Sequence, residues 1–120
     1  MNVRLAKVFS FEAAHFLPRL PSTHKCSRVH GHHFQVDVVV KGPVDPDFGW
    51  FMDYAEIAKA WAPLHETLDH RTLNDVQGLE NPTSENLAFY IWQRLVGGLP
   101  GLSRVVVHET CQARCEYEGD

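Results

Sequence analysis

A thiol, an arginine and three histidines lie within the eight residues from Cys26 to His33. Side chains two positions apart leave the same face of an extended backbone, so His30 and His32 can converge on one metal ion. The residue between them, Gly31, lets the backbone approach that ion closely. A catalytic zinc site takes three protein ligands and keeps a fourth position open. This stretch therefore predicts a third ligand elsewhere in the chain.

The best candidate for the third ligand is His15. It ends a stretch in which apolar side chains fall mostly at odd positions, as in a half-buried strand. The same alternation runs from Phe34 to Val40, and extending it backwards places His30 and His32 on the apolar face. Three histidines at the ends of two buried strand faces predict a half-buried metal site. Zinc is the expected ion, although other divalent metals also bind imidazole.

The remaining histidines outside residues 69–70 have a simpler interpretation. A lone histidine is more often a hydrogen-bonded surface or core residue than a ligand. We therefore expect hydrogen-bonded surface or core positions, with no metal bound, for His24, His33, His65 and His108.

Residues 16–29 contain two prolines and many polar side chains, which predicts a long loop between the two strands. Long loops in compact domains are usually functional. This loop would bring Cys26 beside the metal, where the ion and Arg28 favour the reactive thiolate. The alternative is that Cys26 is a fourth ligand that closes a structural site, although structural sites usually contain two or more cysteines.

Two helices are predicted after the second strand. Asp53 is a good N-cap for the first, and Pro63 is expected to bend or break it. The apolar stripe of this helix comprises Tyr54, Ile57, Trp61, Leu64 and Leu68. The second helix starts within residues 81–86, capped by Thr83 or Ser84, and ends at Gly97-Gly98.

Three further polar residues are candidates for chemistry. Asp69 could orient the imidazole of His70 for proton transfer, but neighbouring residues in an extended chain point apart, so the sequence alone favours a surface pair.

Glu109 shares a predicted strand face with Val105 and Val107. A carboxylate on an apolar face needs a hydrogen-bond donor, which could be a structural arginine or a ligand.

Composition limits the class of protein. The 120 residues fit a single domain spanning residues 1–120, with 44% hydrophobic and 22% charged residues, as in soluble proteins. The net charge of -4 and the absence of a Lys/Arg run argue against nucleic acid and anionic membranes as partners, although a local site can still bind an anionic substrate. We expect a cytoplasmic protein, because no apolar leader or membrane-length segment is visible. The odd number of cysteines fits a reducing compartment, with Cys111 and Cys115 as free thiols.

The order of predicted elements is strand, strand, helix, helix, strand, strand. This order favours an α+β fold in which two helices cover one face of an antiparallel four-stranded sheet. Such a small open sheet has exposed edges, which pairing with other subunits would cover.

Several motifs resemble the 6-pyruvoyl-tetrahydropterin synthase family, in family order and at family spacing from about residue 9 to residue 115. They are Phe11-Glu12-Ala13-Ala14-His15, Cys26-x-x-x-His30-Gly31-His32, Leu68-Asp69-His70, Asn81-Pro82-Thr83-Ser84-Glu85 and His108-Glu109-Thr110. The resemblance implies a tunnelling fold, in which subunits join their sheets into a barrel as trimers or hexamers. It also implies active sites at subunit interfaces.

The resemblance implies a function as well. The three-residue gap between Cys26 and His30 resembles the carboxy branch of the family, a lyase acting on 7,8-dihydroneopterin triphosphate. Its product is 6-carboxy-5,6,7,8-tetrahydropterin, with acetaldehyde and triphosphate released, in queuosine and 7-deazapurine biosynthesis. By resemblance, Cys26, Asp69 and His70 transfer protons, and Glu109 binds the pterin ring. Zinc would be held by His15, His30 and His32.

Two alternatives remain open at this point. The first is the sister branch, which uses the same metal and substrate but forms the 6-pyruvoyl product. The second is a non-catalytic module that binds zinc or a pterin. An open coordination position and a reactive Cys26 argue against the second alternative.

Overall fold

Two antiparallel strands of fourteen residues form the longest structural unit of the molecule. A computed structural model describes all residues, 1–120. Its strands are β1 (Asn2–His15), β2 (His30–Pro43), β3 (Arg71–Thr72), β4 (Leu102–Thr110) and β5 (Ala113–Tyr117). Its helices are α1 (Tyr54–Leu68) and α2 (Ser84–Leu95), with short 3-10 turns at Lys25–Ser27 and Leu73–Asp75. The long strand pair makes the molecule elongated, with extents of 58 × 25 × 24 Å.

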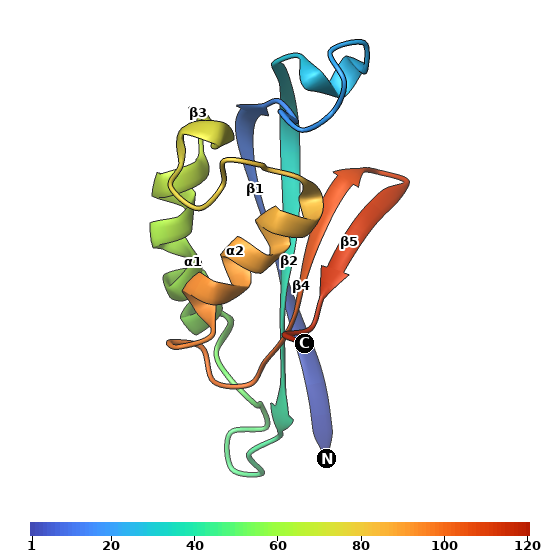
Figure 1. Cartoon of the computed structure of the whole chain (residues 1–120). Coiled ribbons are helices and arrows are strands. Elements are labelled where there is room, and N and C mark those ends of the chain that lie inside the picture. Colours follow the sequence, from blue (N-terminus) through green and yellow to red (C-terminus); the bar gives the residue numbers. More distant parts are fainter.

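The five strands form one open sheet in the order β3-β1-β2-β4-β5, and both helices cover the same face (Figure 1). The predicted α+β class is therefore confirmed. The four predicted strands are β1, β2, β4 and β5, and they pair antiparallel. The fifth strand, β3, has no counterpart among the predicted elements, and it pairs parallel with Ala13 and Ala14 of β1. His70, with φ of 57°, turns the chain after α1 so that these two residues lie along β1.

Alternating residues of the strands and one stripe of each helix form the core. In β2, Phe34, Val36, Val38 and Val40 are buried, as the period of two requires. The buried stripe of α1 is Ile57, Trp61, Leu64 and Leu68, whereas Tyr54 at the first helical position is 52% exposed. Of the predicted bend or break at Pro63, the break is wrong, because α1 continues through this residue to Leu68.

The ends of the helices follow the predicted capping residues. Asp53 accepts a hydrogen bond from the backbone N–H of Ala55 at the start of α1. Thr83, rather than Ser84, caps α2 by accepting from the N–H of Asn86. The residue before this cap is Pro82, so the cap also fixes a backbone segment that contacts the candidate site.

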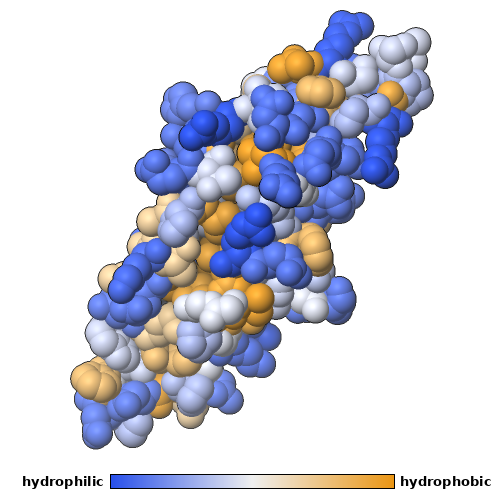
Figure 2. Space-filling view, turned by 60° about the vertical axis from the view of Figure 1, so that its left-hand side comes forward, coloured by the Kyte–Doolittle hydropathy of each residue, from blue (hydrophilic) through white to orange (hydrophobic).

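The surface is mixed in polarity. Figure 2 shows hydrophilic residues over much of one face, with smaller hydrophobic areas between them. Neither helix is long and apolar enough to cross a membrane.

Candidate active site

The antiparallel register of β1 and β2 brings three histidines together at one end of the sheet. His15 is the direct partner of His30, and Ala13 is the partner of His32. The ring centroids lie 4.6 Å apart for His15 and His30, and 4.9 Å apart for His30 and His32. One potential ligand nitrogen from each histidine lies within 4.8 Å of the others. The predicted convergence of the strand ends is confirmed, and this cluster can bind a metal ion.

Hydrogen bonds prepare two of these histidines as ligands. Nδ1 of His15 lies 2.9 Å from the backbone oxygen of Pro82, and Nδ1 of His30 lies 2.7 Å from that of Arg28. A carbonyl oxygen can only accept, so each Nδ1 carries a hydrogen, and in the neutral imidazole the free lone pair is then on Nε2. Metal-binding histidines usually have such a partner, which sets both tautomer and ring orientation.

The environment of His15 is the strongest indication of a metal-binding site. The residue is only 2% exposed, and its Nε2 is buried without any hydrogen-bond partner. Buried polar atoms are normally paired, and a metal ion would supply the missing partner. Burial lowers the pKa of His15, which the hydrogen bond to Pro82 offsets only in part. The imidazole therefore stays in the neutral form that binds metals.

Glu109 lies next to the histidine cluster. Its Oε1 is 3.8 Å from Nε2 of His32, and no arginine or lysine forms an ion pair with it. The arginine of the same strand, Arg104, instead pairs with Glu116 and Glu118 on the opposite side of the hairpin. Within the chain, no arginine takes the structural role that the sequence left open. The carboxylate keeps free acceptor oxygens beside a possible metal centre.

Cys26 lies in the 3-10 turn of the loop between β1 and β2, at the same end of the sheet as the cluster (Figure 1). Its carbonyl accepts a hydrogen bond of 2.7 Å from the N–H of Leu17, and its own N–H donates to Nδ1 of His24. The thiol is half-buried and free. The group of potential ligands contains the three histidines without Cys26, so a fourth, structural ligand is not what the structure favours.

Asp69 and His70 form a hydrogen-bonded pair, which we call the dyad. Oδ2 of Asp69 lies 2.8 Å from Nδ1 of His70. The expectation that these neighbours point apart is wrong, because the left-handed backbone of His70 brings the two side chains together. The N–H of Glu12 and the His70 imidazole hold the pKa of Asp69 below its ordinary value. A carboxylate that remains charged can orient the imidazole for proton transfer.

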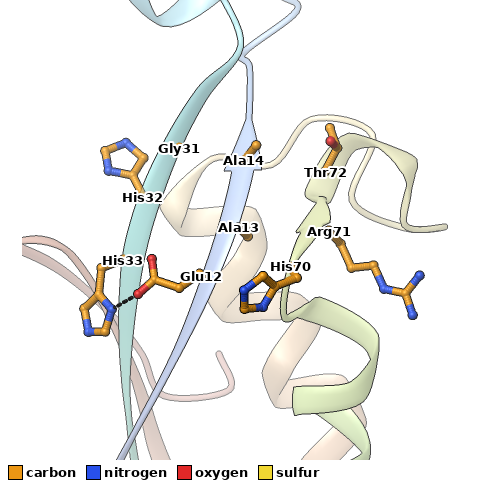
Figure 3. A pocket seen from close by; sticks show the side chains of 9 residues that line it. All are labelled: Glu12, Ala13, Ala14, Gly31, His32, His33, His70, Arg71 and Thr72. Carbon is orange, nitrogen blue, oxygen red and sulfur yellow. Dashed lines mark hydrogen bonds and ion pairs between the residues drawn. The ribbon is translucent and has the colours of Figure 1, made fainter.

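His70 of the dyad borders a shallow cavity of about 430 Å³ that the sequence did not predict (Figure 3). Glu12 and His33 line it and form a hydrogen bond across β1 and β2, while His70 lies on the other side of β1. His32 also borders this cavity, but His15 and His30 do not. The dyad has no hydrogen bond or ion pair with the three histidines. One signal was present in the sequence: Glu12 and His33 share the polar parity of their strands.

The other histidines have ordinary partners, as expected. His108 pairs with Asp37 at 2.9 Å, and His65 lies 3.4 Å from Asp69. Neither belongs to the histidine cluster.

Comparison with known proteins agrees with this geometry. The sequence model of the family described as 6-pyruvoyl tetrahydropterin synthase matches residues 4–120. A 6-carboxy-5,6,7,8-tetrahydropterin synthase of Synechocystis is 43% identical over 117 residues, covering 92% of this chain and 89% of that protein. A dihydroneopterin monophosphate aldolase of Pyrococcus furiosus is 36% identical over 101 residues, covering 84% and 82%.

A solved structure of a member of this family has the same fold as this chain. The 6-pyruvoyl tetrahydropterin synthase of Caenorhabditis elegans superposes with a TM-score of 0.91 and 32% identity, covering all of this chain and 97% of that chain. This similarity confirms the single-chain fold of this family, with its sheet open in one subunit. By sequence and by fold, the chain belongs to the 6-pyruvoyl tetrahydropterin synthase family.

Proposed function

We propose that the chain is a zinc-dependent lyase that converts 7,8-dihydroneopterin triphosphate and water to 6-carboxy-5,6,7,8-tetrahydropterin, acetaldehyde and triphosphate. The pathway would be queuosine and 7-deazapurine biosynthesis. The observation that supports this most is the buried, unpartnered Nε2 of His15 beside His30 and His32. The 43% identity to a synthase with this product supports the carboxy branch.

His15, His30 and His32 would hold the zinc ion. When bound, the ion polarises the side-chain oxygens of the substrate and stabilises negative charge that develops on them. The Nδ1 hydrogen bonds of His15 and His30 would leave the Nε2 atom of each imidazole to bind the ion. No external redox cofactor is required, because the redox change is internal to the substrate.

Glu109 would orient the pterin ring. Its carboxylate has no cationic partner apart from His32, so both oxygens can accept hydrogen bonds from the two parallel N–H groups of the amino-pyrimidinone edge. Hydrogen bonds to a charged acceptor are strong and directional. They would hold the substrate side chain beside the histidine cluster.

Cys26 and the dyad would move the protons. The thiolate of Cys26 would remove a proton from a side-chain carbon, and the imidazole of His70 would serve as the second acid or base. Asp69 would keep that imidazole in one orientation through the bond to Nδ1. This division leaves the catalytic groups on two separate segments, the loop after β1 and the end of α1.

Assembly would complete the site. The edge of β1 is covered by β3 only at Ala13 and Ala14, and β5 forms the other edge of the open sheet. We propose that copies of the chain pair at these edges to form a trimer or hexamer. The dyad has no contact with the histidine cluster within one chain, which supports active sites located between subunits.

Product analysis tests the function. The zinc-loaded protein is incubated with dihydroneopterin triphosphate, using wild type, Cys26→Ala and, as a matched control, Cys111→Ala, whose thiol is exposed in the β4–β5 turn. We expect acetaldehyde and the carboxypterin from wild type and Cys111→Ala only. A pyruvoyl product would assign the sister branch. Bound zinc and pterin without turnover would indicate a binding module.

The number of phosphates on the substrate is a separate question. The relative from Pyrococcus furiosus is named for a monophosphate, whereas the proposed substrate carries three. The same assay with dihydroneopterin monophosphate measures this preference directly.

A further inference from the structure

We propose that the loop of residues 16–29 binds the phosphate chain of the substrate, and that Arg19, Lys25 and Arg28 determine the preference for a triphosphate. This inference rests on the proposed function and deepens it, because it assigns one part of the substrate to one segment. The loop connects β1 and β2 at the end of the sheet where the histidine cluster lies (Figure 1).

The loop is cationic in a chain whose net charge is -4. Arg19, Lys25 and Arg28 are three of eleven Lys and Arg residues, and residues 16–29 contain no Asp or Glu. All three side chains are exposed, and none forms an ion pair. Three of the arginines outside the loop are engaged: Arg104 and Arg114 pair with glutamates, and Arg94 stacks on Tyr90. Arg4 and Arg71 are also exposed without an ion pair, but they lie on β1 and β3, outside this loop. The loop thus holds three cations that remain available for an anion.

The order of groups along the site directs the phosphates toward this loop. Glu109 lies at 3.8 Å from His32, at the inner end of the histidine cluster. At the outer end, Nδ1 of His30 donates a hydrogen bond to the backbone oxygen of Arg28, the second-last residue of the loop. In the substrate, the side chain lies between the ring and the phosphates. With the ring at Glu109 and the side chain at the histidines, the phosphates must extend toward Arg28.

The loop backbone is already ordered. The N–H of Leu17 donates to the carbonyl of Cys26 at 2.7 Å, which closes the loop near its base. Ser27 Oγ donates to the carbonyl of His24 at 2.7 Å. The side chain of Asn74 holds both backbone groups of Phe16, at 3.0 and 2.8 Å. Because these hydrogen bonds restrain the loop backbone, binding an anion mainly has to order the long side chains, which limits the entropic penalty.

The first test compares substrates with three phosphates and one phosphate. We expect the triple variant Arg19→Gln, Lys25→Gln, Arg28→Gln to lose at least about tenfold in kcat/KM for the triphosphate, since even one charge-assisted bond contributes about a factor of ten. The loss for the monophosphate should be clearly smaller. Lys59→Gln, an exposed cation on α1, is the charge-matched control and should leave both values unchanged.

The second test separates this inference from the proposed function. Binding of inorganic tripolyphosphate to the metal-free protein is measured by calorimetry, because this anion would chelate the zinc. We expect binding by wild type and Lys59→Gln and its loss in the triple variant, even if no pterin is turned over. Equal tripolyphosphate binding in all variants, or an unchanged preference between the two substrates, would overturn the proposal. Thermal unfolding of each variant verifies that it is folded.

Discussion

The backbone N–H of Glu12 donates a 2.9 Å hydrogen bond to Oδ1 of Asp69, joining β1 to the end of α1 across 57 residues of sequence. The N–H of His70 returns a bond of 2.6 Å to the carbonyl of Glu12. Three residues further along β1 lies His15, the buried member of the histidine cluster. One strand therefore positions both the candidate metal site and the dyad, although the two have no direct contact.

The bond from Glu12 predicts a stability effect of Asp69 that depends on pH. The pKa of Asp69 in the folded protein is lowered from its ordinary value of 3.8. Its stabilisation is therefore fully present well above pH 3.8 and is lost as the pH falls through the lower folded value. In urea unfolding of the metal-free protein, the difference between wild type and Asp69→Asn should be constant near neutral pH and shrink below 3.8.

The exposed Asp75 provides a control for this measurement, because its side chain has no hydrogen-bond partner. Asp75→Asn should match wild type at every pH. A difference between wild type and Asp69→Asn that stays constant down to the acid transition would contradict the role assigned to the Glu12 bond.

The candidate metal site predicts opposite outcomes for two neighbouring histidines. His32 and His33 are adjacent in β2 and so point to opposite faces of the sheet. Loss of a residue that only hydrogen-bonds to a metal ligand typically lowers metal affinity by about 10–100-fold. His32→Ala removes a proposed ligand itself and should lower zinc affinity by more than this, whereas His33→Ala should bind zinc as wild type does. Metal analysis after dialysis against a competing chelator measures both. Retained zinc in His32→Ala would remove this residue from the ligand set.

Metal removal should also lower the thermal stability of the wild type. An ion that binds the folded state alone stabilises it by mass action, and here it would pair the buried Nε2 of His15. The midpoint of thermal unfolding is compared with and without zinc. The same comparison in His32→Ala should give a much smaller shift, and equal shifts in both proteins would place the ion elsewhere.

Removing the side chain that caps α2 should lower the stability of the protein modestly, and the neighbouring residue provides a matched control. Thr83 accepts the N–H of Asn86, so Thr83→Ala should lower the free energy of unfolding by about 1 kcal/mol. Ser84 bonds only to the neighbouring Glu85, so Ser84→Ala should stay within about 0.5 kcal/mol of wild type. Urea denaturation followed by circular dichroism distinguishes them. Equal effects would contradict the assignment of the cap.

The proposed interface predicts complementation between inactive variants. His32→Ala lacks the metal site and His70→Ala lacks the dyad, so each should be inactive alone. If active sites combine groups from two subunits, co-expressed mixed oligomers contain some intact sites and should regain measurable activity. Activity of the mixture no higher than that of the separate variants would place both groups of one site on the same subunit.

The sequence by itself determined the features that depend on local periodicity and capping. The period of two in β1 and β2 put His15, His30 and His32 on buried faces, because side-chain direction along a strand alternates strictly. The helical stripe ending at Leu68 and the cap near Thr83 followed from spacing in the same way. Each of these needs only residues close in the chain.

Only the tertiary structure decided the features that join distant segments. The left-handed backbone of His70 brings its ring to Asp69 and adds β3 to the sheet. The carbonyl of Pro82, 67 residues away, sets the tautomer of His15. Glu109 has no arginine or lysine partner in the chain, because Arg104 pairs within its own hairpin. Such contacts depend on how the helices pack on the sheet, and no local pattern specifies that packing.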